Sequence, residues 1–188
     1  VELLETVATK ETKRSLAFRL GLSGLRTEEI VGVTARDLRT IEGTDRYVLE
    51  VETAKKQAGT KREPPISRSL AADVLRYQSD VDVGIDDPLI QSKKRTVRSW
   101  IEEAREAFAE RVGESDALEL SMHDLRRTWA TEVYYSLAFA GVPIAEQLVM
   151  SWGGWEQTAQ GRAQFRRDYL GPVPDHVTER AVEHLELV

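Results

Sequence analysis

The chain has 188 residues, no cysteine and a formal charge of −6 at neutral pH. This length predicts one domain over residues 1–188, and the lack of cysteine excludes a disulfide scaffold, a thiolate zinc site and a cysteine nucleophile. No apolar run approaches the ~20 residues that a membrane-spanning helix needs, so we expect no membrane partner. Because the first residue is Val rather than Met, we expect the chain to be a piece of a longer protein.

The first quarter of the chain predicts short helices. Apolar positions between residues 2 and 22 have the spacing of one or two helices, which would end at Ser23-Gly24. Thr27 is a suitable N-cap for a further helix, and Glu28 and Glu29 would then lie in its first turn, where the helix dipole favours anions.

The period of the pattern changes after residue 46. Alternation over residues 47–52 predicts a half-buried strand, and residues 61–66 can return beside it as the partner strand. Pro64 and Pro65 would lie at the end of that strand or on an edge, where a missing N–H is tolerated. We therefore expect a β-hairpin and not the core of a large sheet.

The remainder of the chain predicts helices only. Gly141 is a plausible end of one helix, and Pro143 and Pro174 suit the beginnings of two others. The expected architecture is a mainly α domain with a small antiparallel β-hairpin. The apolar stripes lie within residues 70–77, 97–108 (opened by Thr96), 125–137, 144–148 and 177–185.

Basic residues form short clusters, although the negative net charge argues against a generic nucleic-acid binder. One such cluster is most often a solvated face. Several in an acidic chain favour a basic working site surrounded by an acidic surface. The clusters are Lys55-Lys56, Lys61-Arg62, Lys93-Lys94-Arg95, Arg126-Arg127 and Arg166-Arg167.

One candidate site residue stands at a predicted helix start, in Gly24-Leu25-Arg26-Thr27-Glu28-Glu29. The Arg26 guanidinium and the N–H groups of the helix start can converge on one anion. Glu29, one turn further on, can brace that arginine. The alternative is a purely structural surface arginine near a helix start.

A second candidate is the segment His123-Asp124-Leu125-Arg126. Positions i and i+3 share a helical face, so His123 and Arg126 can address the same group while Leu125 points to the core. A structural histidine is the alternative interpretation.

The third candidate combines Trp152-Gly153-Gly154-Trp155 with a later tyrosine, Tyr169. Core packing is the default interpretation for the tryptophans. Tyr169 follows Arg166-Arg167, and a flanking positive potential would favour the phenolate form that a nucleophile needs.

Taken in chain order, the motifs resemble those of the catalytic domain of tyrosine recombinases of the phage-integrase family. The order is Gly-Leu-Arg-x-x-Glu, a lysine-bearing hairpin, His-x-x-Arg, Gly-Trp and a late tyrosine, and it covers the whole chain. The Trp-Gly-Gly-Trp segment is most similar to archaeal integrases, particularly those of halophiles. The resemblance implies the α+β tyrosine-recombinase catalytic-domain fold.

The resemblance also implies a role for each matching residue. Arg26 and Arg126 would together bind the non-bridging oxygens of a scissile DNA phosphate, and His123 would be a proton-transfer and hydrogen-bonding partner there. Trp155 stands where the family has His or Trp. Tyr169 would be the nucleophile.

The family's catalytic lysine lies in the hairpin turn and protonates the leaving 5′ oxygen. Lys55 and Lys56 both qualify, and counting back from the Pro-Pro pair slightly favours Lys56. The other basic residues of these segments are expected to contact DNA, namely Lys55, Lys61, Arg62 and Arg127.

Two features depart from the family. The interval from Trp155 to Tyr169 is longer than usual, which suggests an insertion around Gln157–Arg162, and the hairpin turn is also slightly longer. Tyr134 and Tyr135 are poorer nucleophile candidates because they lie on the His-x-x-Arg helix itself.

The implied reaction is transesterification through a 3′-phosphotyrosyl intermediate, without metal or cofactor. The implied partner is double-stranded DNA. The resemblance also implies a tetramer on DNA, a monomer when free, and an additional N-terminal DNA-binding domain. The implied location is cytoplasmic and nucleoid-associated. The runner-up is a non-cleaving DNA-binding regulator on the same fold. An α-helical interaction domain without a DNA role, and a type IB topoisomerase, are weaker alternatives.

Overall fold

The computed structural model describes residues 12–53, 60–113 and 119–185. The chain divides into two compact units, Val1–Arg126 and Arg127–Val188. The expectation of a single domain stays a prediction.

The first unit contains most of the helices and all of the described strands. Its elements are α2 (Thr12–Gly21), α3 (Thr27–Ile30), the 3-10 helix η1 (Ala35–Asp37), β1 (Leu38–Thr40), β2 (Tyr47–Leu49), β3 (Val51–Glu52), β4 (Lys61–Arg62), β5 (Pro65–Ile66), α4 (Arg68–Asp80), α5 (Lys94–Val112) and the start of α6 (Met122–Phe139).

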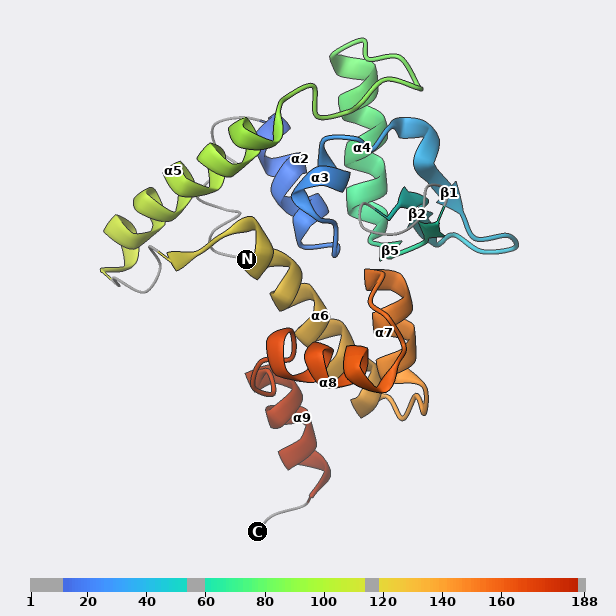
Figure 1. Cartoon of the computed structure of the whole chain (residues 1–188), viewed down its shortest axis with the longest axis vertical. Helices are drawn as coiled ribbons and strands as arrows, with labels where there is room; N and C mark the ends of the chain where they lie inside the picture. Colours follow the sequence, from blue (N-terminus) through green and yellow to red (C-terminus); the bar gives the residue numbers. More distant parts are fainter. Residues whose placement is uncertain (1–11, 54–59, 114–118, 186–188) are drawn as a thin grey trace. The chain divides into compact units, whose positions relative to one another are not determined.

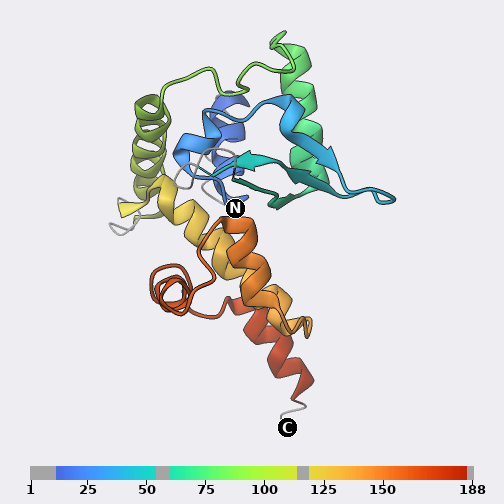
Figure 2. The same cartoon turned by 45° about the vertical axis from the view of Figure 1, so that its right-hand side comes forward.

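Helix α2 is the centre of this unit. It packs against α3, α4 and α5, and Figures 1 and 2 show it between α4 and α5. Phe18 and Leu20 of α2 are fully buried, and each side chain of this kind stabilises the fold by about 1.5–3 kcal/mol relative to exposure. This core holds in place the segment that follows α2, which contains Arg26.

The predicted hairpin is confirmed, but its sheet is larger than expected. Strands β1, β2 and β5 form an antiparallel sheet in that order, and β3 pairs with β4 as a separate antiparallel pair. The first strand of the hairpin is divided at Glu50, which lies between β2 and β3 and whose N–H donates to the carbonyl of Asp37. Strand β1 was not predicted. Pro65 opens β5 on an edge, as expected.

Helix beginnings follow local capping, with one shift. Ser67 caps α4 by accepting a hydrogen bond from the N–H of Leu70 at 3.1 Å. Helix α5 begins at Lys94, two residues before the predicted Thr96; its N-cap Lys93 has an extended backbone and makes no side-chain cap hydrogen bond.

The second unit consists of the rest of α6, α7 (Ala145–Gly153), α8 (Ala159–Asp168) and α9 (Asp175–His184). Its core contains Trp129, Val149, Met150 and Phe165. Gly141 has a positive φ of 75° after α6, in agreement with the predicted end of that helix. The mainly α fold with a small antiparallel sheet is therefore confirmed.

Helix α8 lies between Trp155 and Tyr169, where the sequence suggested an insertion. Thr158 caps it by accepting a hydrogen bond from the N–H of Gly161 at 3.0 Å, so most of the residues between Trp155 and Tyr169 form a helix. Among the described residues, none of the helices combines the length and apolar character that crossing a membrane requires.

Candidate functional site

The start of α3 orients Arg26. Arg26 is the N-cap, one residue before the predicted Thr27, because its backbone N–H donates to Glu29 Oε2 at 2.6 Å. Its Nη1 donates to Glu29 Oε1 at 2.8 Å. The carboxylate of the third helical residue thus reaches back to the residue before the helix, which is the capping-box arrangement. The predicted bracing of Arg26 by Glu29 is confirmed.

Arg62 reaches the same carboxylate from strand β4. Its Nη2 donates to Glu29 Oε2 at 2.5 Å and its Nε lies 3.4 Å from Oε1. Only 3% of the Arg62 side chain is exposed. In this structure the guanidinium expected to contact DNA is instead buried in an ion pair.

The carbonyl of Gly24 joins a third guanidinium to this group. It accepts a hydrogen bond from Arg62 Nη2 at 3.0 Å and another from Arg126 Nη1. Gly24 has a φ of 85°, a left-handed conformation that glycine adopts without strain. This turn aims the carbonyl at two arginines that come from β4 and α6.

We call Arg26, Glu29, Arg62 and Arg126 the arginine cluster. Three guanidiniums and one carboxylate give it a formal charge of +2, since Glu29 is ionised. Burial acts to raise the pKa of Glu29, but the charge and hydrogen bond of Arg62, followed by those of Arg26, outweigh it and lower the pKa. The cluster therefore presents positive charge, which suits an anion such as a phosphate.

The start of α6 places two further predicted residues of the first unit, His123 and Arg126. The N–H and the hydroxyl of Ser121 donate to Asp124 Oδ2 at 3.0 and 2.5 Å, which fixes the first turn of the helix. Leu125 is buried as predicted, and Arg126 is 1% exposed. His123 is exposed on the same turn.

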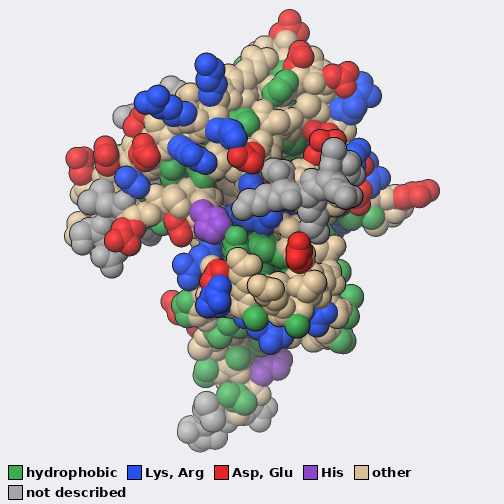
Figure 3. Space-filling view, in the orientation of Figure 1, with side chains coloured by type: hydrophobic (Ala, Val, Ile, Leu, Met, Phe, Trp, Pro, Cys, Tyr) green, Lys and Arg blue, Asp and Glu red, His purple; other side chains and the backbone are tan. Residues whose placement is uncertain are grey.

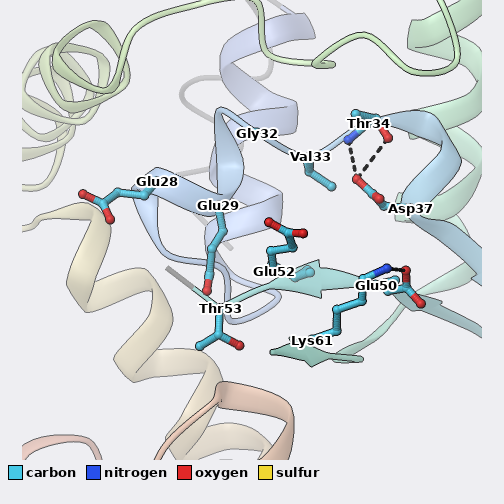
Figure 4. A pocket seen from close by; sticks show the side chains of 11 residues that line it. Glu28, Glu29, Gly32, Val33, Thr34, Asp37, Glu50, Glu52, Thr53 and Lys61 are labelled. Carbon is cyan, nitrogen blue, oxygen red and sulfur yellow. Dashed lines mark hydrogen bonds and ion pairs between the residues drawn. The ribbon is translucent and has the colours of Figure 1, made fainter. Parts of the chain in front are cut away.

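Lys61 is the exposed neighbour of Arg62 on β4. It forms an ion pair with Glu50, whose hydrogen bond and charge raise the pKa of the Lys61 ammonium. A cavity of about 410 Å³ lies beside this pair, and Figure 4 shows Lys61 and Glu50 on its wall. Its carboxylates make the cavity unsuitable for phosphate; they are Glu28, Glu29, Asp37, Glu50 and Glu52.

Three further predicted residues do not belong to the arginine cluster. Lys55 and Lys56, the candidates for the catalytic lysine, lie outside the described residues. Arg127, an expected DNA contact, is exposed on α6.

In the second unit, the structure brings Trp155 and Tyr169 together despite their long interval. Their ring centroids are 4.6 Å apart in an edge arrangement, and Trp155 also contacts Phe165 at 4.8 Å. Tyr169 is the C-cap of α8. Its position at a helix end, partly exposed, is compatible with a residue that must reach a substrate.

Thr131 anchors the segment around Tyr169, and sequence analysis did not single it out. Its hydroxyl donates to the Tyr169 carbonyl at 3.0 Å and accepts from the N–H of Gly171 at 2.9 Å. A buried threonine on the inner face of α6, two residues after Trp129, was the only available signal.

The arginines beside Tyr169 are engaged with carboxylates. Arg166 Nε donates to Glu146 at 2.5 Å, and Arg167 binds Asp168 through Nε and Nη2 at 2.7 and 3.1 Å. The flanking positive potential inferred from the sequence is therefore partly balanced by these acids.

Gly153 is required for the position of Trp155. A Cβ at Gly153 would lie 1.8 Å from an atom of the Trp155 ring, so Gly153→Ala must displace the indole from Tyr169 and Phe165. Overpacking of this kind costs about 1–3 kcal/mol. We expect a lower unfolding midpoint and changed tryptophan fluorescence. Gly32→Ala is the control, because its Cβ would meet its nearest atom at an ordinary 3.6 Å; equal effects of the two variants would contradict the prediction.

Within residues 12–53, 60–113 and 119–185, no group of three His, Asp or Glu side chains could hold a metal ion. No protein-family model matches the sequence, and no curated protein matches it significantly.

The fold is similar to that of three solved recombinase structures. A XerA recombinase crystal structure matches with a TM-score of 0.65 and 14% identity, covering 99% of this chain and 62% of that one. The XerH site-specific recombinase, in a post-cleavage complex with its palindromic difH substrate, matches with 0.63 and 15%, covering 98% and 51%. The Tn1549 transposon integrase, in complex with transposon right end DNA, matches with 0.60 and 16%, covering 99% and 64%.

At these identities the similarity establishes the fold alone. The chain has the fold of tyrosine-recombinase catalytic domains and spans less than two thirds of the length of each of these structures.

Proposed function

We propose that this chain is the catalytic domain of a site-specific DNA recombinase or integrase that cleaves and rejoins DNA through a 3′-phosphotyrosyl link. One observation carries the proposal. Arg126 donates to the carbonyl of Gly24, 102 residues earlier in the chain, and Gly24 immediately precedes the Leu25-Arg26 segment. The two arginines that the resemblance assigns to one phosphate thus belong to a single hydrogen-bonded cluster.

The proposed reaction exchanges one phosphate ester bond for another, so it needs no external energy source. The Tyr169 hydroxyl gives its proton to His123 as its oxygen attacks the DNA phosphorus, the bond from phosphorus to the 5′ oxygen breaks, and a second 5′-hydroxyl later reverses the step. Lys56 gives a proton to the departing 5′ oxygen, His123 is the proton-transfer partner at the phosphate, and Trp155 supports Tyr169. Catalysis of this kind is mostly positioning and charge stabilisation.

Arg26 and Arg126 supply the charge stabilisation in this proposal. A guanidinium donates through a planar fork that matches two phosphate oxygens, whereas an ammonium is a single point charge. Phosphate binding by the arginine cluster fits its formal charge of +2. Double-stranded DNA as partner agrees with the DNA complexes among the similar structures.

The larger assembly is also part of the proposal. We propose an N-terminal DNA-binding domain outside these residues, a tetramer on DNA, a monomer when free, and a nucleoid-associated location in the cytoplasm. Val182 of α9 and Leu185, the C-cap of that helix, are exposed, so this segment has apolar surface that a neighbouring subunit could cover.

A second basic surface, the α5 patch, consists of Lys93, Lys94, Arg95 and Arg98. All four are exposed, and Figure 3 shows Lys and Arg side chains gathered over the beginning of α5. Cations at a helix N-terminus are unfavourable with respect to the helix dipole. Glu28 pairs with Lys94, and a negatively charged partner such as the DNA backbone would offset the cost of the other three.

We expect the α5 patch to contribute to the salt dependence of DNA binding. The logarithm of affinity should fall linearly with the logarithm of salt concentration, and Arg98→Gln should reduce the slope by about 0.9 for one lost phosphate contact. Sequence preference should not change. Arg36→Gln is the control, because Arg36 is held by Asp86. A salt slope that Arg98→Gln leaves unchanged in fluorescence-anisotropy titrations would remove this surface from the DNA interface.

The experiment that tests the proposed function is a covalent-trapping assay. The intact protein is incubated with nicked duplex DNA that carries a site selected with this protein from a random-sequence library. The nick lets the short product diffuse away, so that the phosphotyrosyl link accumulates. We expect a denaturation-resistant protein–DNA band. Sequence-specific binding without such a band would favour the non-cleaving regulator.

A further inference from the structure

We infer that Arg62 is a positioning residue for the proposed cleavage reaction: it fixes Arg26 and Arg126 relative to each other by bridging Glu29 and the Gly24 carbonyl. This inference rests on the proposed function and assigns Arg62 a role other than DNA contact.

Two chains of hydrogen bonds meet at the Arg62 guanidinium. In one, Nη2 binds Glu29 Oε2 at 2.5 Å, and the other oxygen of that carboxylate accepts from Arg26 Nη1 at 2.8 Å. In the other, the same Nη2 lies 3.0 Å from the Gly24 carbonyl, which also accepts from Arg126. Arg62 is thus the shared neighbour of the acceptors that orient the two proposed phosphate-binding arginines.

The buried ion pair with Glu29 separates this role of Arg62 from direct binding; burial alone does not, because Arg126 is equally buried. Its side chain is 3% exposed and that of Glu29 is 1% exposed, whereas the side chain of Arg26 is 19% exposed. A group that is buried in the free protein and paired with a buried carboxylate acts on the substrate through its neighbours. Strand pairing supports this geometry, since Arg62 lies opposite Val51 across the β3–β4 pair.

The bridge requires a guanidinium. Arginine presents donors in a rigid planar fork, so Nε and Nη2 can face Glu29 while Nη2 also faces the Gly24 carbonyl. Lysine keeps the positive charge that the buried carboxylate needs, but its single nitrogen on a flexible stem does not reproduce the fork. Arg62→Lys therefore removes the positioning while it retains the charge.

The test compares cleavage rate with DNA affinity for Arg62→Lys in the intact protein. Single-turnover trapping on the nicked substrate measures the chemical step, and anisotropy measures binding to the same DNA. We expect unchanged affinity and a cleavage rate lower by about 100-fold, because a misplacement of about 1 Å can have that effect. Arg39→Lys on β1, an exposed arginine paired with Glu63, is the matched control and should cleave at the wild-type rate.

A second substrate distinguishes positioning from general damage to the fold. When one non-bridging oxygen of the scissile phosphate is replaced by methyl, the phosphate loses its charge and depends less on the two arginines. The deficit of Arg62→Lys should therefore shrink on the methylphosphonate DNA. A deficit of equal size on both substrates would overturn the inference, and so would a wild-type rate on the charged substrate.

Thermal melting shows whether Arg62→Lys is folded at the assay temperature. If it is not, Glu29→Gln takes its place, because an amide offers one acceptor oxygen where the carboxylate offers two. Glu29→Gln should show the same lower cleavage rate, again with a smaller deficit on the methylphosphonate DNA. If Glu29→Gln shows no such deficit, the inference is overturned. If the wild type forms no adduct on either substrate, the proposed function fails; if the wild type cleaves and the variants match it, the inference alone fails.

Discussion

Arg126→Ala is expected to abolish nearly all DNA cleavage and to destabilise the protein at the same time. Loss of one preorganised charge contact raises a reaction barrier by about 3–4 kcal/mol. Arg126 is 1% exposed and its guanidinium donates to the Gly24 carbonyl, so its removal also loses a charged hydrogen bond that contributes about 1.5–3 kcal/mol. Single-turnover trapping and urea denaturation measure the two effects separately.

Two further variants separate charge from geometry at this position. Arg126→Lys retains the charge and should recover part of the stability but not the cleavage, because an ammonium lacks the guanidinium fork. Arg127→Ala, at the adjacent exposed position, should weaken DNA binding and leave the rate at saturating DNA intact. A folded Arg126→Ala variant with near wild-type cleavage would refute the proposed role.

Glu29→Ala is expected to cause the largest loss of stability among these variants. It removes the carboxylate that pairs with the buried Arg62 and with Arg26, and breaking a buried ion pair from one side costs about 3–5 kcal/mol. Urea denaturation at neutral pH measures the change. Glu63→Ala is the control: its pair with Arg39 is exposed and contributes no more than about 1 kcal/mol. Equal losses in the two variants would contradict the buried-pair account.

The pH dependence of stability provides an independent check on Glu29. The folded state lowers its pKa below the ordinary 4.5, so the ionised carboxylate stabilises the fold fully above about pH 4.5, and this contribution is lost as the pH falls through the lowered value. The wild type should therefore lose more stability than Glu29→Gln when the pH falls from about 5 to 3. This range extends about one to two units around the ordinary pKa of a glutamate. Parallel curves for the two proteins would contradict the prediction.

Local patterns in the sequence predicted the hairpin and most of the helices. Arg26 and Glu29 are three residues apart, so a capping-box interaction between them follows from helix geometry alone. The spacing of the apolar residues Leu125 and Trp129 likewise predicts that they lie on the buried face of a helix, and both are buried.

Non-local contacts could not be predicted in the same way. The partners of Arg62 lie 33 and 38 residues earlier in the chain, and the same two-residue Lys61-Arg62 cluster is equally compatible with a solvated face. Strand alternation offered the only hint, because adjacent residues of a strand point to opposite faces. Strand β1 has only three residues, too short for a periodic signal.

The interval between Trp155 and Tyr169 illustrates a different difficulty. Its composition is polar, and only Phe165 of α8 is buried, so periodicity gave no sign of the helix. The cap at Thr158 and the ring contacts of Trp155 define it instead, and both become evident only when the chain is folded.

The most direct measurement of the central claim is mass spectrometry of the trapped adduct after proteolysis. The account predicts that the nucleotide is attached to the peptide that contains Tyr169, and that Tyr169→Phe forms no adduct. This variant keeps the ring that contacts Trp155 and the backbone carbonyl that binds Thr131, so it should remain folded and bind DNA. An adduct on Tyr134 or Tyr135, or undiminished adduct formation by Tyr169→Phe, would contradict the account.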